Sequence, residues 1–445
     1  MARPHPINSN PGQPEDSAIA GFRFIHTADI HLDSPLKSLA LRNPELAELV
    51  GGATRQVFSD IVDLCIGESV DALIIAGDLY DGDQTSMKTA RFLASELNRL
   101  AAAGIRTFII RGNHDALSRI SRELVLPDTV KLFSGRGEHV VIERGQGGKP
   151  VAIHGLSFAN PTAPESLLSK YARPLPDAIN IGIMHTSLGG APGHDPYAPC
   201  SPAELQATGY DYWALGHIHK RSVITGPATI VMPGMPQGRD INEEGVKSVT
   251  LVSITDGGET KLEEKRTAIA EFARVQVDAS GLGDWNELAD AITAALTPAR
   301  AGSSAPHLVV RLVFSGETTL AWRMRRDAEL LAAEADERAA QIGNTWIEKL
   351  DIACLPPALP HASATDPLHE LRSLIENDIL GSDAYEVALA GVAETLQAQL
   401  PTDLRDLFGT DETGTAARRM ELARQGAEDV LARLQAPHNT GSETA

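Results

Sequence analysis

The chain has 445 residues, more than one hydrophobic core usually serves, so we expect two or three domains. Its net charge of −20, from 59 acidic and 39 basic residues, argues against a protein whose main role is to coat nucleic acid. Its 42% hydrophobic content includes no long uninterrupted apolar run, which excludes a transmembrane helix.

Residues 1–21 are rich in proline, asparagine and serine and contain no apolar segment of the kind found in secretory signals. We therefore expect a disordered leader there. The three cysteines, Cys65, Cys200 and Cys354, lie far apart and form no CxxC pair, as is typical of reduced thiols. These features predict a cytoplasmic protein.

Residues 22–258 repeat one pattern, in which a short apolar run is followed by Gly, Asp, His or Asn. The pattern appears in "FRFIHTADIH", "ALIIAGDLYD", "RTFIIRGNHD", "VAIHG", "NIGIMHTSLGG", "DYWALGHIHK" and "ATIVMPGMPQG". Buried strands that end in polar loops have this pattern, and "RFLASELNRLAAAG" has helical periodicity. We expect an α/β domain with a central sheet, in which sites form at strand ends.

Residues 268–355 predict a small α+β domain. We expect strands at "FARVQVDA", "HLVVRLVF" and "TWIEKLDIACL", a capped helix at "DWNELADAITAAL", and one long helix at "LAWRMRRDAELLAAEADERAAQI".

The rest of the chain predicts helices bounded by flexible segments. Residues 356–367 are rich in proline and small residues and are expected to form a linker. Residues 368–435 are expected to be helical and to bind a partner, with Leu371, Leu374, Ile375 and Ile379 on one helical face. Residues 436–445 complete the chain as a disordered tail.

Polar side chains follow the predicted strands of the first domain at the points where the strands end. They are Asp29, His31, Asp78, Asn113, His114, His185, His217 and His219. Within "GHIHKR", His217 and His219 would face the same side of a strand. Each residue alone has an ordinary explanation, as a helix cap, a turn residue or a solvated strand end. Their joint occurrence after successive strands favours one shared site.

The residue types in this set indicate a metal site. Carboxylates, imidazoles and one amide are a mixed ligand set that suits Mn²⁺, Fe²⁺ or Zn²⁺. No thiolate joins them, which argues against a structural zinc site.

The spaced order Asp-x-His, Gly-Asp, Gly-Asn-His-Asp, His and Gly-His-x-His resembles the calcineurin-like metallophosphoesterase superfamily. Within it, "FRFIHTADIHLDSPL", "AGDLYD", "IRGNHD" and "DYWALGHIHKR" are similar to the SbcD-like DNA repair exonucleases, most closely to the YhaO type. The resemblance is strong over residues 22–255. It implies a four-layered αββα metallophosphoesterase core, followed by a small α+β capping domain and a helical C-terminal segment.

The resemblance also implies two divalent metal ions, commonly Mn²⁺, that activate a hydroxide and neutralise the phosphate oxygens. It would assign Asp29, His31 and His219 to the first metal, Asn113, His185 and His217 to the second, and Asp78 to a bridge between them. His114 would protonate the leaving oxygen or stabilise the transition state, and Asp115 would orient His114.

Some neighbouring residues depart from the family pattern. Asp81 stands where several relatives place a histidine near the substrate, which leaves the contact with the scissile strand open. His26, His154 and His194 lie close to the motifs but off the pattern, so we expect structural or rim roles for them.

Basic residues beside the motifs have two interpretations. Arg111, Lys220, Arg221 and Arg239 could contact backbone phosphates, in which case binding would be sensitive to salt, or they could be solvated rim charges.

Three functions fit the sequence. The first is a DNA exonuclease or endonuclease subunit, associated with the nucleoid, that works with an SbcC-like SMC-type coiled-coil ATPase and could form a homodimer. The second is a phosphodiesterase or phosphatase for a small molecule or protein. The third is a scaffold with a vestigial site, against which the intact ligand set argues.

Overall fold

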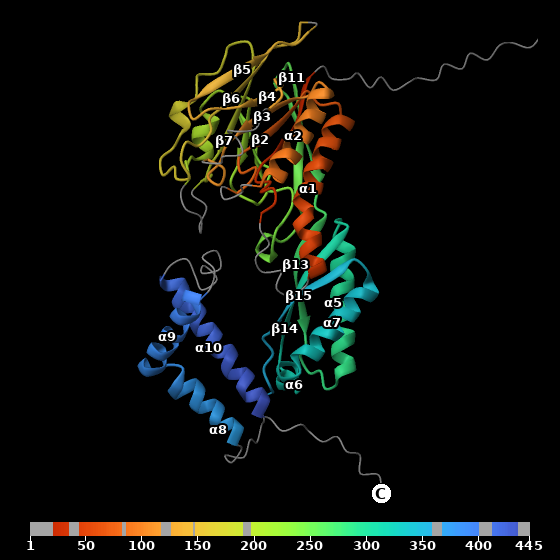
Figure 1. Cartoon of the computed structure of the whole chain (residues 1–445), viewed down its shortest axis with the longest axis vertical. Coiled ribbons are helices and arrows are strands. Elements are labelled where there is room, and N and C mark those ends of the chain that lie inside the picture. Colours follow the sequence, from red (N-terminus) through yellow and green to blue (C-terminus); the bar gives the residue numbers. More distant parts are fainter. Residues whose placement is uncertain are drawn as a thin grey trace, which may run out of the picture. The chain divides into compact units, whose positions relative to one another are not determined.

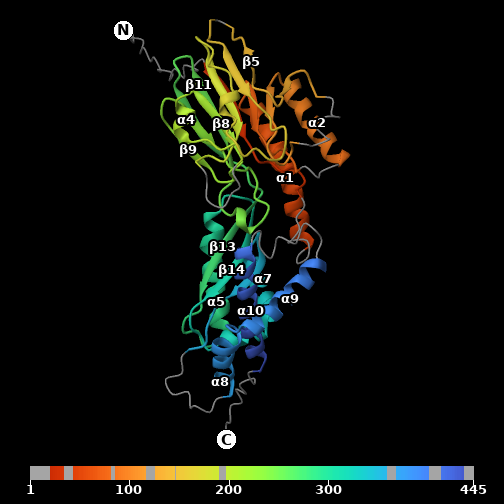
Figure 2. The same cartoon turned by 90° about the vertical axis from the view of Figure 1, so that its left-hand side faces the viewer.

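The computed structural model describes residues 21–34, 44–81, 86–116, 126–145, 147–189, 197–357, 367–399 and 412–434. The described residues form two compact units. The first comprises those within Met1–Leu32, Phe58–Pro236 and Ser248–Lys265, and the second those within Asp33–Val57, Gln237–Lys247 and Arg266–Ala445. Figures 1 and 2 show the elements in two views.

The first unit contains a six-stranded sheet with the order β12-β11-β1-β2-β3-β4. Its strands are β1 (Gly21–Thr27), β2 (Ala72–Ala76), β3 (Arg106–Ile110), β4 (Val130–Leu132), β11 (Ser248–Thr255) and β12 (Thr260–Arg266). Neighbours from β1 to β4 are parallel, so the carboxyl ends of these strands lie along one edge.

A second six-stranded sheet in this unit has the order β5-β6-β7-β8-β10-β9. Its strands are β5 (Glu138–Ile142), β6 (Val151–Gly155), β7 (Ile179–His185), β8 (Tyr212–Gly216), β9 (Ser222–Ile224) and β10 (Thr229–Met232). The strands β6, β7, β8 and β10 are parallel, and β5 and β9 are antiparallel edges.

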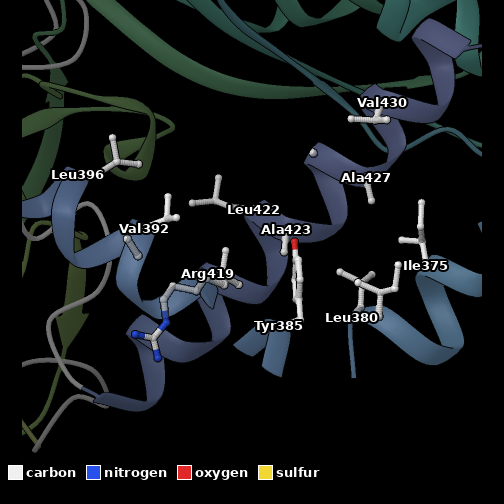
Figure 3. Close-up of a pocket in the computed structure, with 14 residues that line it drawn as sticks. Ile375, Leu380, Tyr385, Val392, Leu396, Arg419, Leu422, Ala423, Ala427 and Val430 are labelled. Carbon is white, nitrogen blue, oxygen red and sulfur yellow. The ribbon is translucent and has the colours of Figure 1, made fainter. Parts of the chain in front are cut away.

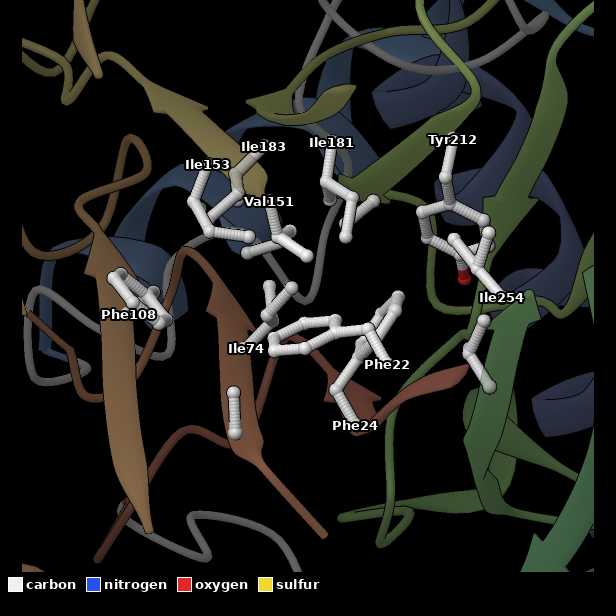
Figure 4. Close-up of a cluster of buried hydrophobic side chains, with 14 of the residues drawn as sticks. Phe22, Phe24, Ile74, Phe108, Val151, Ile153, Ile181, Ile183, Tyr212 and Ile254 are labelled. Atoms are coloured by element: carbon white, nitrogen blue, oxygen red, sulfur yellow. The ribbon is translucent and has the colours of Figure 1, made fainter. Parts of the chain in front are cut away.

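The core of the first unit lies between the two sheets (Figure 4). Phe24 and Phe108 of the first sheet pack with Ile181, Ile183 and Tyr212 of the second, and all five are buried. Burying each such side chain stabilises the fold by about 1.5–3 kcal/mol. This packing holds the two sets of strand ends in place.

Helices cover the outer faces of both sheets, which confirms the predicted α/β class. The first sheet is covered by α2 (Met87–Ala102), whose Phe92 contacts Phe58 of α1 (Pro44–Gly67). Trp213 on the outer face of the second sheet packs near α4 (Pro202–Gln206) and the 3₁₀ turn η1 (Leu168–Lys170). The layer over the second sheet is therefore thin.

The second unit contains a parallel three-stranded sheet with helices. Its elements are η2 (Ile241–Glu243), β13 (Ala270–Asp278), α5 (Trp285–Gly302), β14 (His307–Ser315), α6 (Ala321–Arg326), α7 (Ala328–Ile342) and β15 (Thr345–Ile352). Asp284 caps α5 through a capping box with Glu287, as the sequence predicts.

The prediction of one long helix at residues 320–342 is wrong, because the helix breaks at Asp327 into α6 and α7. The Asp327 backbone is not helical, with φ −102° and ψ 37°. Its carboxylate accepts two hydrogen bonds from the Arg326 guanidinium, and α7 begins at the next residue, Ala328.

The C-terminal helices also belong to the second unit. They are α8 (Pro367–Leu374), the π turn η3 (Ile375–Ile379), α9 (Asp383–Gln399) and α10 (Glu412–Leu434). The π turn follows Leu374, which is 47% exposed, and precedes Leu380, which is buried. Within the described parts of the chain, no helix has both the length and the apolar character that a membrane crossing requires.

His26 is a buried polar residue in this core and makes the stability of the first unit depend on pH. Its Nδ1 lies 3.0 Å from the Tyr212 hydroxyl, and its Nε2 lies 3.0 Å from the Leu215 carbonyl oxygen. Burial lowers the pKa of His26 from 6.5 to about 3. Between these two pH values the unfolded chain binds a proton that the folded chain does not, so stability falls as the pH drops below 6.5.

We expect His26→Gln to weaken this pH dependence. In the natural chain, each pH unit below 6.5 should cost up to about 1.4 kcal/mol through His26, so the variant should lose about 2 kcal/mol less between pH 7 and pH 5. Urea unfolding at the two pH values measures the difference. The same pH dependence in both proteins would contradict the assignment.

Candidate metal centre

The eight polar residues that the sequence singles out lie at the carboxyl ends of parallel strands of both sheets. Asp29 and His31 follow β1, Asp78 follows β2, Asn113 and His114 follow β3, His185 ends β7, and His217 and His219 follow β8. In open α/β sheets this is the edge where sites form.

The backbone at four of these residues is in the left-handed region. The φ angles are 52° at Asp29, 47° at His31, 50° at Asp78 and 103° at His217. Each such residue costs on the order of 1–3 kcal/mol, so the surrounding structure must hold it in place. Strained backbone at strand ends is typical of functional sites.

Three glycines make room for the site. A Cβ at Gly77 would lie 2.4 Å from His185 Nδ1, and one at Gly216 would lie 2.1 Å from the Ala76 carbonyl oxygen. A Cβ at Gly112 would lie 2.3 Å from Asp78 Oδ1. The glycines of "AGD", "RGN" and "LGH" are therefore required because the ligand side chains pack directly against the backbone.

One group of side chains is Asp29, His31 and His219, whose ligand atoms lie within 4.8 Å of one another. The Nε2 atom of His219 is 3.9 Å from Asp29 Oδ1, and the His31 and His219 rings are 5.3 Å apart. Asp29 and His31 are fully buried, whereas the side chain of His219 is 30% exposed. These residues are the ones that the sequence assigns to the first metal.

A second group is Asp78, His185 and His217, whose ligand atoms also lie within 4.8 Å of one another. Asn113 joins it, because its Oδ1 lies 3.0 Å from His185 Nε2. The Nε2 atom of His185 is also 3.2 Å from Asp78 Oδ2. The structure thus brings the residues predicted for the second metal around the predicted bridging carboxylate.

The electrostatics at His185 fit a bound cation. Its Nδ1 lies 2.9 Å from the Ala76 carbonyl oxygen and so donates a proton there, which leaves the Nε2 lone pair facing the oxygens of Asp78 and Asn113. Burial lowers the pKa of His185, but the Asp78 carboxylate outweighs burial and raises it to about 9. Facing lone pairs require a positive charge between them, which a proton or a divalent metal ion supplies.

Backbone amides connect the two groups. The His217 amide donates to both carboxylate oxygens of Asp29, at 3.1 and 2.9 Å, and the His114 amide donates to Asp78 Oδ1 at 3.0 Å. Burial opposes ionisation of Asp78, yet His185, His31 and His114 together hold the pKa of Asp78 well below its usual range. Asp78 is therefore charged at the centre of the site.

A third group, His31, Asp81 and His114, extends the site towards solvent. Asp81 Oδ1 lies 2.8 Å from His31 Nδ1 and 3.1 Å from His114 Nδ1. The side chain of His114 is 47% exposed. The sequence pattern located Asp81, three residues after Asp78, but did not reveal that it contacts two histidines of the site.

The structure gives Asp115 a different role from the predicted one. Its carboxylate accepts hydrogen bonds from the amides of Leu79, at 3.1 Å, and Gly112, at 2.7 Å, and so joins the loops after β2 and β3. Burial, together with the charge of Asp78, raises the pKa of Asp115 to about 7. Asp81 contacts the His114 ring instead.

Other candidates lie apart from this chemistry. His26 is buried in the core, His154 bonds Asn180 with its Nε2 at 3.0 Å, and His194 lies outside the described residues. Arg221 bonds the Thr250 hydroxyl, and Arg239 forms an ion pair with Glu243 at 2.6 Å. These two arginines are therefore engaged within the chain.

Comparison with known proteins finds matches in two regions of the chain. Residues 22–221 match the calcineurin-like phosphoesterase family, and residues 272–355 match the middle domain of metallophosphoesterase YhaO. The uncharacterized metallophosphoesterase YhaO of Bacillus subtilis is 31% identical over 75% of this chain and 82% of its own length.

Two nuclease relatives are more distant. The SbcD subunit of the nuclease SbcCD of Bacillus subtilis is 26% identical, over 55% of this chain and 69% of its own. The DNA double-strand break repair protein Mre11 of Methanopyrus kandleri is 27% identical, over 48% of this chain and 49% of its own.

We expect Gly112→Ala to disrupt the centre without unfolding the first unit. The new methyl group would collide with Asp78 Oδ1 and with His185 and would displace these side chains. A displacement of about 1 Å lowers the rate about 100-fold, so we expect a loss of that order. Metal content by mass spectrometry and hydrolysis of bis-p-nitrophenyl phosphate measure the effect. Gly67→Ala is the control, because no described atom lies within 4 Å of its Cβ position; equal losses in both variants would contradict the prediction.

Proposed function

Because the chain belongs to the metallophosphoesterase family that includes YhaO, we propose that it is a DNA repair nuclease subunit that hydrolyses phosphodiester bonds at DNA ends. The observation that carries the proposal is the pair of ligand groups that contain Asp29 and Asp78, which the hydrogen bonds from the His217 amide to Asp29 join. The similarity to the SbcD subunit and to Mre11 supports DNA as the substrate.

We assign the ligands of two divalent ions, with Mn²⁺ as the first candidate, to the two groups. One ion would be held by Asp29, His31 and His219. The other ion would be held by Asn113, His185 and His217. Asp78 would contact both ions. When bound, the ions would supply charge neutralisation on the phosphate and activation of the water nucleophile. The mixed oxygen and nitrogen donors suit such an ion.

His114 is assigned as the acid that protonates the leaving oxygen. The Asp81 carboxylate lies 3.1 Å from His114 Nδ1, which leaves Nε2 as the atom that would exchange a proton with the substrate. The same carboxylate lies 2.8 Å from His31 Nδ1, so His31 Nε2 is the atom that would bind the metal. Asp81 thus acts as a positioning residue for both histidines.

The C-terminal helices are assigned to a coiled-coil ATPase partner. They form an apolar groove lined by Tyr385, Val392, Leu396, Leu422 and Val430 (Figure 3). Val392 is 59% and Leu396 51% exposed, as a helix-binding groove requires. One relative is named as a subunit of the nuclease SbcCD, and this also supports a function within a complex.

We expect His114→Ala to retain metal but to cleave DNA about 10²- to 10⁴-fold more slowly, because only the proton transfer is removed. Release of nucleotides from labelled duplex DNA, in Mn²⁺, Mg²⁺ and Zn²⁺, measures cleavage. The control is His139→Ala, since His139 is an exposed histidine of β5 outside the site.

Two outcomes would contradict these assignments. DNA cleavage by His114→Ala at the natural rate would remove His114 from the mechanism. Strong hydrolysis of phosphomonoesters or small phosphodiesters by the natural chain, with no DNA cleavage in any metal, would favour the alternative of a small-molecule or protein phosphoesterase.

We expect His217 and His219 to serve different metals. Each single alanine variant should lose one equivalent of metal per chain. The double variant His217→Ala/Asn113→Ala should lose no more metal than His217→Ala alone, because both residues serve one ion. The double variant His217→Ala/His219→Ala should lose both metal ions. Mass spectrometry after gel filtration measures the stoichiometry, and the opposite ranking of the two double variants would refute the assignment.

A further inference from the structure

Several cations of the first unit have no acidic partner among the described residues, although the chain has a net charge of −20. Arg23, Arg99, Lys131, Arg144 and Lys265 each lie within 4.0 Å of a carboxylate. By contrast, Arg111, Arg136, Lys170 and Lys220 form no such ion pair with any described carboxylate. We call these four residues the basic row.

The basic row follows the edge of the second sheet on which the candidate metal centre lies. Along this edge, Lys220 lies in the loop after β8, His185 ends β7, and Gly155 ends the neighbouring strand β6. Arg136 lies two residues before Glu138, the first residue of β5, which pairs with Gly155. Lys220 and Arg136 therefore lie on opposite sides of the centre.

Arg111 links the centre to the rest of the row. Its amide donates to Ser157 Oγ at 2.9 Å, and its carbonyl oxygen accepts from the Phe158 amide at 3.0 Å. The Phe158 ring in turn contacts His185, with centroids 5.7 Å apart. Among the described residues, the buried Arg111 Nε has no acceptor, and the Arg111 side chain is only partly buried.

Arg136 and Lys170 lie side by side at the far end of the row. A Cβ at Gly137 would lie 1.9 Å from the Lys170 carbonyl oxygen, so the two backbones are in direct contact. Both side chains are exposed. Of the nearby acids, Glu138 is engaged with Lys131 at 2.8 Å, and Glu165 is exposed.

From this arrangement we propose that the basic row binds the phosphates of one DNA strand and leads it across the metal centre towards β5. The proposal rests on the nuclease function above. Three strand spacings separate β8 from β5, about 15 Å, which corresponds to about four nucleotides at a rise of about 3.4 Å. Contacts to phosphates make such binding independent of sequence.

The test removes the two residues farthest from the chemistry. Arg136→Ala with Lys170→Ala, in a His114→Ala chain that prevents cleavage, should bind a labelled single-stranded oligonucleotide more weakly in Mn²⁺. The slope of log affinity against log salt should become shallower by about 1.4, because two phosphate contacts are lost. Fluorescence anisotropy between about 50 and 200 mM NaCl measures both.

The matched control removes two exposed cations from the opposite edge of the second sheet. Lys149 lies in the turn before β6, and Arg173 follows Ala172, whose carbonyl oxygen accepts from Tyr210 just before β8. Lys149→Ala with Arg173→Ala should leave the slope within experimental error of the parent chain. The control pair should also leave hydrolysis of bis-p-nitrophenyl phosphate unchanged in the chain with natural His114.

The outcomes separate the two proposals. Equal slopes for the two double variants, with DNA bound and cleaved, would overturn the basic row and leave the nuclease function intact. Hydrolysis of bis-p-nitrophenyl phosphate without binding or cleavage of DNA by the natural chain would overturn both.

Discussion

The charged Asp78 carboxylate is the constraint on which the candidate site depends. It accepts the His114 amide at 3.0 Å and lies 3.2 Å from His185 Nε2, so it connects the loops after β2 and β3 to the end of β7. These elements come from both sheets, and the core between the sheets fixes their distance. Gly112 leaves room for the carboxylate, and Asp115 ties together the loops on either side.

Much of the first unit could be predicted from the sequence, because parallel strands buried on both faces are continuous apolar runs. The segment Ala72–Ala76 is one example, buried at each residue. The polar residues after such runs meet because the carboxyl ends of parallel strands share an edge. The role of Asp81 could not be read in this way, since its contacts depend on how the loops after β1, β2 and β3 fold together. The break at Asp327 could not be predicted, because the helical pattern continues on both sides of this residue.

The distribution of charge is compatible with the proposed action of this acidic chain on DNA. Many of its arginines and lysines are neutralised by nearby carboxylates, as at Arg311, which Glu348 binds at 2.8 Å in the second unit. Their role is internal, so the overall charge says little about the surface beside the site. A local field from a few cations without acid partners is sufficient where the substrate passes.

The burial of the ligands is uneven, and this has a consequence for metal exchange. Asp78 and His185 are 2% and 0% exposed, whereas the side chain of His219 is 30% exposed. In the proposed two-ion centre, His219 is more exposed than His185 and His217, so the ion that His219 would hold is expected to exchange with solvent first. A shortage of metal in the cell would then empty the His219 position before the His185 position.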